Sequence, residues 1–94
     1  MGQVIYSYDP KKAEANFARH GVRFEEAEDF EWNTALEFED AAIHNEVRMV
    51  AIGMIRGKCH VLVYTVRDDT IRLISLRRAE PKERRRYHEA SRQT

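Results

Sequence analysis

The first twenty-one residues carry a pattern typical of a strand followed by a helix. Val4 to Tyr8 alternates weakly between apolar and polar positions, which favours a short strand. Asp9-Pro10 is a typical helix start, because aspartate caps free N–H groups and proline lacks one at the first helical position. Gly21 is typical of the left-handed residue that ends a helix. The sequence therefore predicts a helix over 10–20, on which three residues share one face: Ala13, Phe17 and His20.

A second short helix is predicted over about 24–32. Its apolar positions, Phe24, Ala27 and Phe30, fall toward the core, and its carboxylates fall outside.

After Asn33 the period of the pattern changes from helical to two, which is typical of strands. The expected strands cover 35–40, 47–55, 59–67 and 70–77. Tight turns at Arg56-Gly57-Lys58 and Asp68-Asp69 join the last three of them. Simple alternation in the last strand places two sets of side chains on opposite faces: Ile71, Leu73 and Ser75 on one, and Arg72, Ile74 and Leu76 on the other.

Pro81 opens a final predicted helix that runs to about residue 90 and has Tyr87 and Ala90 as its apolar residues. So polar a helix is not expected to be held firmly by core packing. Four consecutive strands with short connections imply an antiparallel meander. The sequence thus predicts one α+β domain over 1–94, with an N-terminal strand and two helices, a four-stranded antiparallel meander and a C-terminal helix.

The composition excludes some classes of protein. A chain of 94 residues has room for one modest core, and 34% charged residues exceed the usual quarter. Uncharged stretches such as Met49 to Ile55 are far too short to span a membrane. No secretion signal is visible at the start, and the single Cys59 cannot form an internal disulfide. Both observations favour a cytoplasmic protein.

The net charge of zero hides an uneven distribution. Residues 1–46 carry four basic and eleven acidic side chains, a net of −7, whereas residues 47–94 carry twelve basic and five acidic ones, a net of +7. Such asymmetry points to a polyanionic partner, because Lys and Arg displace counterions from phosphates. Two other interpretations remain open. The halves could neutralise each other across the fold, or the C-terminal charges could form a solvated helix face.

The chain offers no pattern for metal or nucleotide binding. Its four histidines are far apart in sequence, cysteine pairs are absent, and neither HExxH nor an EF-hand loop occurs. A P-loop and a GxGxxG motif are also missing. We therefore expect no metal and no cofactor.

Phosphodiester chemistry suits the chain better. Cleaving RNA without metal needs a base for the 2′-hydroxyl, cations around the reacting phosphate and an acid for the leaving oxygen. Arginine grips phosphate with two parallel donors, and four arginines lie on adjacent predicted strands: Arg48, Arg67, Arg72 and Arg77. His20 is the best proton-transfer group, since imidazole titrates near neutrality. The alternatives are that His20 only packs at a helix end, and that each arginine only pairs with the carboxylate-rich segment.

An ordered set of short motifs runs from about residue 6 to residue 89. The motifs are Tyr8-Asp9-Pro10, Lys12-Ala13, Asn16, His20-Gly21-Val22, Phe24-Glu25-Glu26-Ala27, Phe30, Glu46, Arg48, Ile52-Gly53, Gly57, Val63-Tyr64-Thr65, Arg67, Arg72-Leu73-Ile74-Ser75, Arg77, Ala79, Glu83-Arg84 and Tyr87. Together they resemble the BrnT family. The chain departs from the family pattern at Trp32-Asn33, where Asp-Pro is usual, at Leu76 in place of alanine, and at Tyr8 in place of tryptophan.

The resemblance implies a RelE-like fold and the ribonuclease toxin of a bacterial type II toxin–antitoxin system. It also implies a BrnA antitoxin that neutralises the toxin, and promoter DNA bound through their complex. On this basis we expect a metal-independent endoribonuclease that inhibits translation and growth. Arg48, Arg67 and Arg77 would hold the scissile phosphate, and His20 or Lys11 would move protons. The expected RNA-binding residues are Arg72, Arg84, Arg85, Arg86 and Tyr87.

Two other functions remain open at this point: a DNA-binding transcriptional repressor component, and a catalytically inactive subunit of the complex. An antitoxin is expected to cover the basic half of the chain, contacting Arg77 or residues 82–86.

Overall fold

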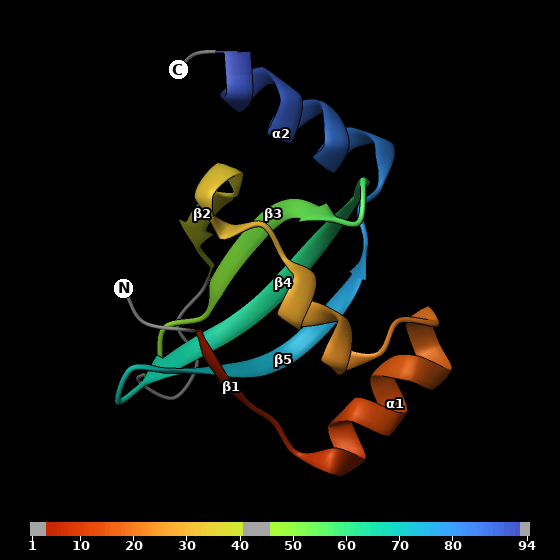
Figure 1. Ribbon diagram of the computed structural model, residues 1–94, viewed down its shortest axis with the longest axis vertical. Helices are drawn as coiled ribbons and strands as arrows, with labels where there is room; N and C mark the ends of the chain where they lie inside the picture. The colour runs from red at the N-terminus through yellow and green to blue at the C-terminus, as the bar shows by residue number, and fades with distance from the viewer. Residues whose placement is uncertain (1–3, 41–45, 93–94) are drawn as a thin grey trace.

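The computed structural model describes residues 4–40 and 46–92, which form a five-stranded sheet with helices around it (Figure 1). The elements follow in the order β1 (Ile5–Ser7), α1 (Pro10–His20), the 3₁₀ helices η1 (Phe24–Asp29) and η2 (Trp32–Thr34), β2 (Leu36–Glu39), β3 (Met49–Ile55), β4 (Lys58–Arg67), β5 (Thr70–Arg78) and α2 (Pro81–Arg92). The predicted α+β class is confirmed.

The strands are ordered β1-β5-β4-β3-β2 across the sheet. β2 to β5 pair antiparallel in chain order, whereas β1 pairs parallel with Thr70–Arg72 of β5, so the sheet is mixed. The two-residue turns Arg56-Gly57 and Asp68-Asp69 have positive φ at all four residues. Such turns match the right-handed twist of the strands that they join, which is why these hairpins are tight.

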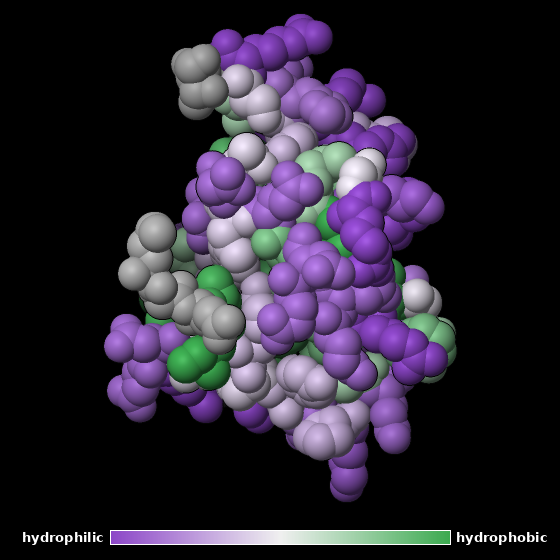
Figure 2. Space-filling view, viewed as in Figure 1, coloured by the Kyte–Doolittle hydropathy of each residue, from purple (hydrophilic) through white to green (hydrophobic). Residues whose placement is uncertain are grey.

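The two faces of the sheet carry different side chains. On one face Leu62, Tyr64, Leu73 and Leu76 pack under η1 and η2, and we call this the aromatic face because Phe24, Phe30 and Trp32 cover it. The other face carries Val61, Val63, Thr65, Arg72 and Arg77, and we call it the arginine face. Seen from the side of η1 and η2, the surface is mostly hydrophilic and its hydrophobic patches are small (Figure 2).

A β-bulge in β5 overturns the simple alternation expected for that strand. Val63 pairs with Ser75, but the next residue, Tyr64, pairs with Leu73, so Ile74 is the extra residue. Leu76 consequently lies in the same buried cluster as Leu73 instead of facing the other way. The bulge also puts Arg77 on the same face as Arg72, whereas unbroken alternation would place them on opposite faces.

α1 begins and ends as predicted. The Asp9 side chain accepts a 2.8 Å hydrogen bond from the Lys11 N–H, and Gly21 adopts φ 70° while its N–H bonds the Phe17 carbonyl. Its inward face is different, because Phe17 is 42% exposed and Asn16 is the buried residue of the helix.

Asn16 joins α1 to β5. Its Nδ2 donates to the carbonyl oxygens of Leu76 at 2.8 Å and Val22 at 3.0 Å, and its Oδ1 accepts the Leu76 N–H at 3.1 Å. The side chain therefore satisfies both backbone groups of Leu76, as a neighbouring strand would.

The helix predicted over 24–32 is shorter and of another type. η1 ends at Asp29, and Phe30 is extended and forms a β-bridge with Ile55, so the helix does not continue. The core positions Phe24, Ala27 and Phe30 are confirmed as buried. Gly53 makes this packing possible, because an added Cβ would lie 2.7 Å from the Phe30 ring.

α2 is held more firmly than its polar sequence suggests. Tyr87 is buried against the arginine face with Val61 and Ile52, and its hydroxyl lies 3.4 Å from the Thr34 hydroxyl. An ion pair between Arg77 and Glu83 ties the first turn of α2 to β5. The buried Tyr87 ring and the Arg77–Glu83 ion pair thus hold α2 on the sheet, although the helix has no continuous apolar face.

Replacing Asn16 with alanine should lower the free energy of unfolding by about 3 kcal/mol, because it leaves buried backbone groups of Leu76 and Val22 without partners. Urea unfolding of Asn16→Ala and Phe17→Ala measures this. Phe17→Ala removes a larger but exposed side chain and should cost about 1 kcal/mol or less. A greater loss from Phe17→Ala than from Asn16→Ala would contradict the assignment.

Candidate functional site

The structure divides the predicted arginines between two ends of the arginine face. Arg67 and Arg72 lie on this face near the β4–β5 turn, and Arg77 lies near α2. Thr65, opposite Arg72, and Val61, opposite Arg77, are four residues apart in β4, which corresponds to about 13 Å. Arg48 directly precedes β3, where its carbonyl accepts the Asp40 N–H at 2.7 Å.

These arginines differ in their partners. Arg67 pairs with Glu46, with N–O distances of 2.8 Å from Nε and 2.6 Å from Nη2, so the carboxylate-rich segment does pair with one of them. Arg48 and Arg72 are half-buried, and neither side chain makes a hydrogen bond or ion pair with another described residue. Their guanidinium groups therefore keep donors for a ligand.

Arg77 makes the most ordered contact of the set. Its Nη1 and Nη2 bind the two carboxylate oxygens of Glu83, each at 2.8 Å, and the Glu83 carboxylate also accepts the Glu80 N–H. The hydrogen bond from Arg77 lowers the pKa of Glu83, and the same pair raises the pKa of Arg77. A carboxylate thus occupies both donors of the guanidinium, a two-point geometry that also suits phosphate.

His20, at the end of α1, lies near enough to this arginine for the guanidinium charge to act on the imidazole. Partial burial lowers the pKa of His20, and the nearby charges of Arg19 and Arg77 lower it further. The imidazole is therefore mostly neutral at pH 7 and is able to accept a proton. Lys11 is exposed and lies nine residues earlier on α1, about 13 Å along the helix axis, so the structure does not bring it to His20.

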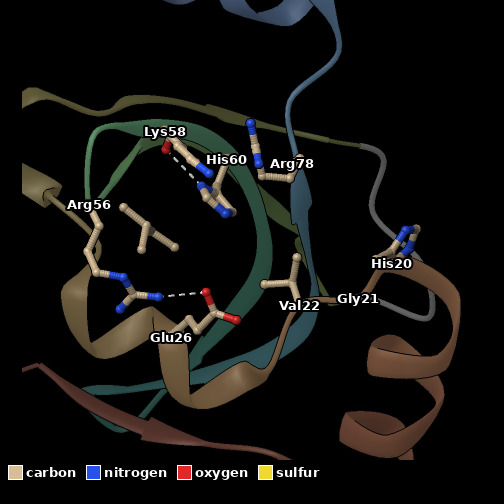
Figure 3. A pocket seen from close by; sticks show the side chains of 9 residues that line it. His20, Gly21, Val22, Glu26, Arg56, Lys58, His60 and Arg78 are labelled. Carbon is tan, nitrogen blue, oxygen red and sulfur yellow. Dashed lines mark hydrogen bonds and ion pairs between the residues drawn. The ribbon is translucent and has the colours of Figure 1, made fainter.

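A cavity of about 430 Å³ has His20 at its border (Figure 3). Its charged and polar lining comes from the end of α1, from η1 and from the β3–β4 and β5 ends: His20, Glu26, Arg56, Lys58, His60 and Arg78. Arg56 is paired with Glu26 at 2.8 Å and also with Asp29. Lys58 and Arg78 are exposed cations, and neither side chain bonds another residue in the described part of the chain.

His60 is the functional candidate that the sequence interpretation missed. It is 4% exposed, and its Nδ1 lies 2.8 Å from the Lys58 carbonyl, which only accepts, so Nδ1 carries the proton. Nε2 is then a hydrogen-bond acceptor. Burial lowers the pKa of His60; the Lys58 carbonyl and Glu26 oppose this shift, and Arg78 and Arg56 add to it. Strand alternation with Leu62 and Tyr64 was the available signal that His60 faces inward.

The α2 residues that were predicted to bind RNA differ in how far their side chains are already engaged within the chain. Arg84 donates to the Ala79 carbonyl at 3.0 Å, and the Arg86 guanidinium lies 4.2 Å from the centre of the Phe38 ring. Arg85 is exposed. Tyr87 was expected to contact RNA, but its ring is buried in the core and is not open for stacking on a base.

In residues 4–40 and 46–92, no three His, Cys, Asp or Glu side chains gather closely enough to hold a metal ion. Within the same ranges, no helix has the length and apolar character needed to cross a membrane.

Comparison with protein families places the chain. Residues 8–83 match the family model described as the ribonuclease toxin, BrnT, of type II toxin–antitoxin systems. The chain belongs to the BrnT family. A search of curated proteins gave no match. The segment that matches the BrnT model contains His20, His60 and Arg77 but ends at Glu83, so most of α2 lies beyond it.

The burial of His60 predicts a pH-dependent stability. Because its pKa in the folded chain lies below 6.5, the unfolded chain binds more protons between the two values. The free energy of unfolding should therefore fall as the pH drops from 7.5 to 5.5, and His60→Gln should remove the share due to this residue. Urea unfolding of the wild type and of His60→Gln at pH 7.5 and 5.5 measures this difference. His20 is present in both proteins, so its contribution to the pH dependence is common to them. An equal pH dependence in wild type and His60→Gln would contradict the prediction.

Proposed function

We propose that this BrnT chain cleaves RNA without a metal ion, and that it thereby inhibits translation and growth. The observation that carries the proposal is the placement of a neutral His20 beside Arg77 at one end of the arginine face, in a member of a ribonuclease toxin family. A base and a bidentate cation are two of the groups that metal-free cleavage requires.

The proposed roles follow from this placement. His20 takes the proton of the 2′-hydroxyl, which then attacks the adjacent phosphorus as the bond to the 5′-oxygen breaks. Arg77 stabilises the charge that develops on the phosphate, once the phosphate has displaced Glu83 from its guanidinium. Arg48, Arg67 and Arg72 bind the RNA backbone farther along the same face. The leaving 5′-oxygen takes its proton from solvent.

The proposed partners follow from the family and from the charges. A BrnA-type antitoxin neutralises the toxin in the cytoplasm, and promoter DNA is bound through their complex. The five-stranded sheet and its helices support a RelE-like layout. On this layout, the antitoxin covers the basic half of the chain. Arg85 and the neighbouring cations of α2 attract an acidic antitoxin segment or RNA, and both attractions weaken with salt.

Purified protein, incubated with RNA in excess EDTA, should cleave it. His20→Gln should lower the rate by about 10²-fold or more, since acid–base groups contribute about 10² to 10⁴. Activity that disappears with the chelator would contradict metal-free cleavage. A folded chain that binds promoter DNA and cleaves no RNA would favour the repressor, and a folded chain that does neither would favour an inactive subunit.

A matched pair of variants separates the two roles of Arg77 in this assay. Arg77→Ala removes the contact between β5 and α2, and Glu83→Gln removes its charge and its second acceptor oxygen but keeps the guanidinium available for phosphate. We expect Arg77→Ala to lose at least about tenfold in rate and Glu83→Gln to keep the wild-type rate or exceed it. Equal losses in the two variants would show that Arg77 only anchors α2.

A further inference from the structure

The cavity beside His20 combines two kinds of group that a nucleotide needs. Lys58 and Arg78 supply positive charge whose side chains bond no other described residue. His60 supplies an acceptor, because its proton is held on Nδ1 by the Lys58 carbonyl and Nε2, on the other side of the ring, faces the cavity (Figure 3). Cations alone would suit any anion, whereas a neutral acceptor among them favours a ligand that also donates a hydrogen bond.

The other lining residues fit the base of a nucleotide and leave the positive charge available for its phosphate. Val22 and Ile55 are buried and give the cavity an apolar wall. Glu26, the acidic group of the lining, is already paired with Arg56, so it leaves the charge of Lys58 and Arg78 uncompensated. A volume of about 430 Å³ lies within the range of small-ligand pockets.

We propose that this cavity binds one ribonucleotide unit of the RNA, with its phosphate on Lys58 and Arg78 and its ribose 2′-hydroxyl donating to His60 Nε2. The base lies against Val22 and Ile55. The proposal rests on the ribonuclease function proposed above and adds to it a binding site whose lining includes His20 but not Arg77. The 2′-hydroxyl distinguishes RNA from DNA, so His60 is the residue that selects ribose.

The charged groups around His60 support this role. Arg78 and Arg56 disfavour its protonation together with burial, and they outweigh the opposing effects of Glu26 and the Lys58 carbonyl. His60 therefore stays an acceptor at neutral pH, as a hydroxyl donor requires.

The test uses two mononucleotides as probes, adenosine 3′-monophosphate and its 2′-deoxy counterpart, titrated into the full chain at low salt. The readouts are the dissociation constants and the NMR shifts of the His60 ring. The ribonucleotide should bind about fivefold or more tightly than the deoxynucleotide, which is the effect of one hydrogen bond. His60→Phe should abolish this preference. Equal affinity of the two probes for the wild type, or an unperturbed His60 ring, would overturn the proposal.

Two exposed-site variants keep the test decisive if His60→Phe does not fold. Lys58→Gln and Arg78→Gln should weaken both probes by similar factors of about fivefold or more and leave the ribose preference intact. Arg92→Gln, at the exposed end of α2, is the matched control and should change neither affinity. Unchanged affinity in both the Lys58 and the Arg78 variants would overturn the assignment of the phosphate.

RNA cleavage measured in parallel separates this proposal from the proposed function. A wild type that prefers the ribonucleotide yet cleaves no RNA would refute the ribonuclease function and leave the nucleotide site in place. A His60→Phe or Lys58→Gln chain that loses nucleotide binding but cleaves RNA at the wild-type rate would refute a role for this cavity in the substrate complex.

Discussion

The three hydrogen bonds of Asn16 are the interaction on which the arrangement of this chain depends. β1 pairs with Thr70–Arg72, so the later part of β5 needs another partner on that side. Asn16 supplies both a donor and an acceptor to Leu76, and it also binds the Val22 carbonyl just after the end of α1. One side chain thus fixes the end of α1 against the sheet. His20 is placed beside Arg77 as a result, and residues 21–22 are placed at the wall of the cavity.

The bulge at Ile74 is the second constraint, and it decides which charges share a face. Because the pairing skips Ile74, Leu73 and Leu76 both enter the aromatic core while Arg72 and Arg77 both face the other way. Arg77 then stands next to Arg78, which faces the cavity side of the sheet. The neighbouring arginines at the end of β5 therefore lie on different surfaces, Arg77 on the arginine face and Arg78 in the cavity lining. His20 lies near both. Glu83 occupies the Arg77 guanidinium, so in the proposed site the docking of α2 and the binding of an RNA phosphate compete for that group.

Local signals in the sequence predicted much of this structure. The caps Asp9 and Gly21 and the left-handed turns act over a few residues, so their residue types suffice to identify them. The partners of β5 could not be predicted in this way. Its parallel pairing with β1 and its bond to Asn16 join segments some sixty residues apart, and the bulge depends on which register buries Leu76. Candidate residues followed the same division. Charge and residue type suggested His20 and Arg77 as candidate site residues. His60 is a candidate because it is buried and bonded to the Lys58 carbonyl, and sequence spacing reveals neither property.

In the proposed function, RNA is bound at the end of the sheet where Asn16 holds the helix that carries His20. The most direct measurement is ultraviolet cross-linking of the wild-type chain to a short RNA that carries 4-thiouridine, with the linked peptides mapped by mass spectrometry. The structure predicts cross-links in segments 20–22, 58–60 and 77–78, in addition to any along the arginine face. Cross-links confined to β1 and the Asp68-Asp69 turn, with none in those three segments, would contradict the claim.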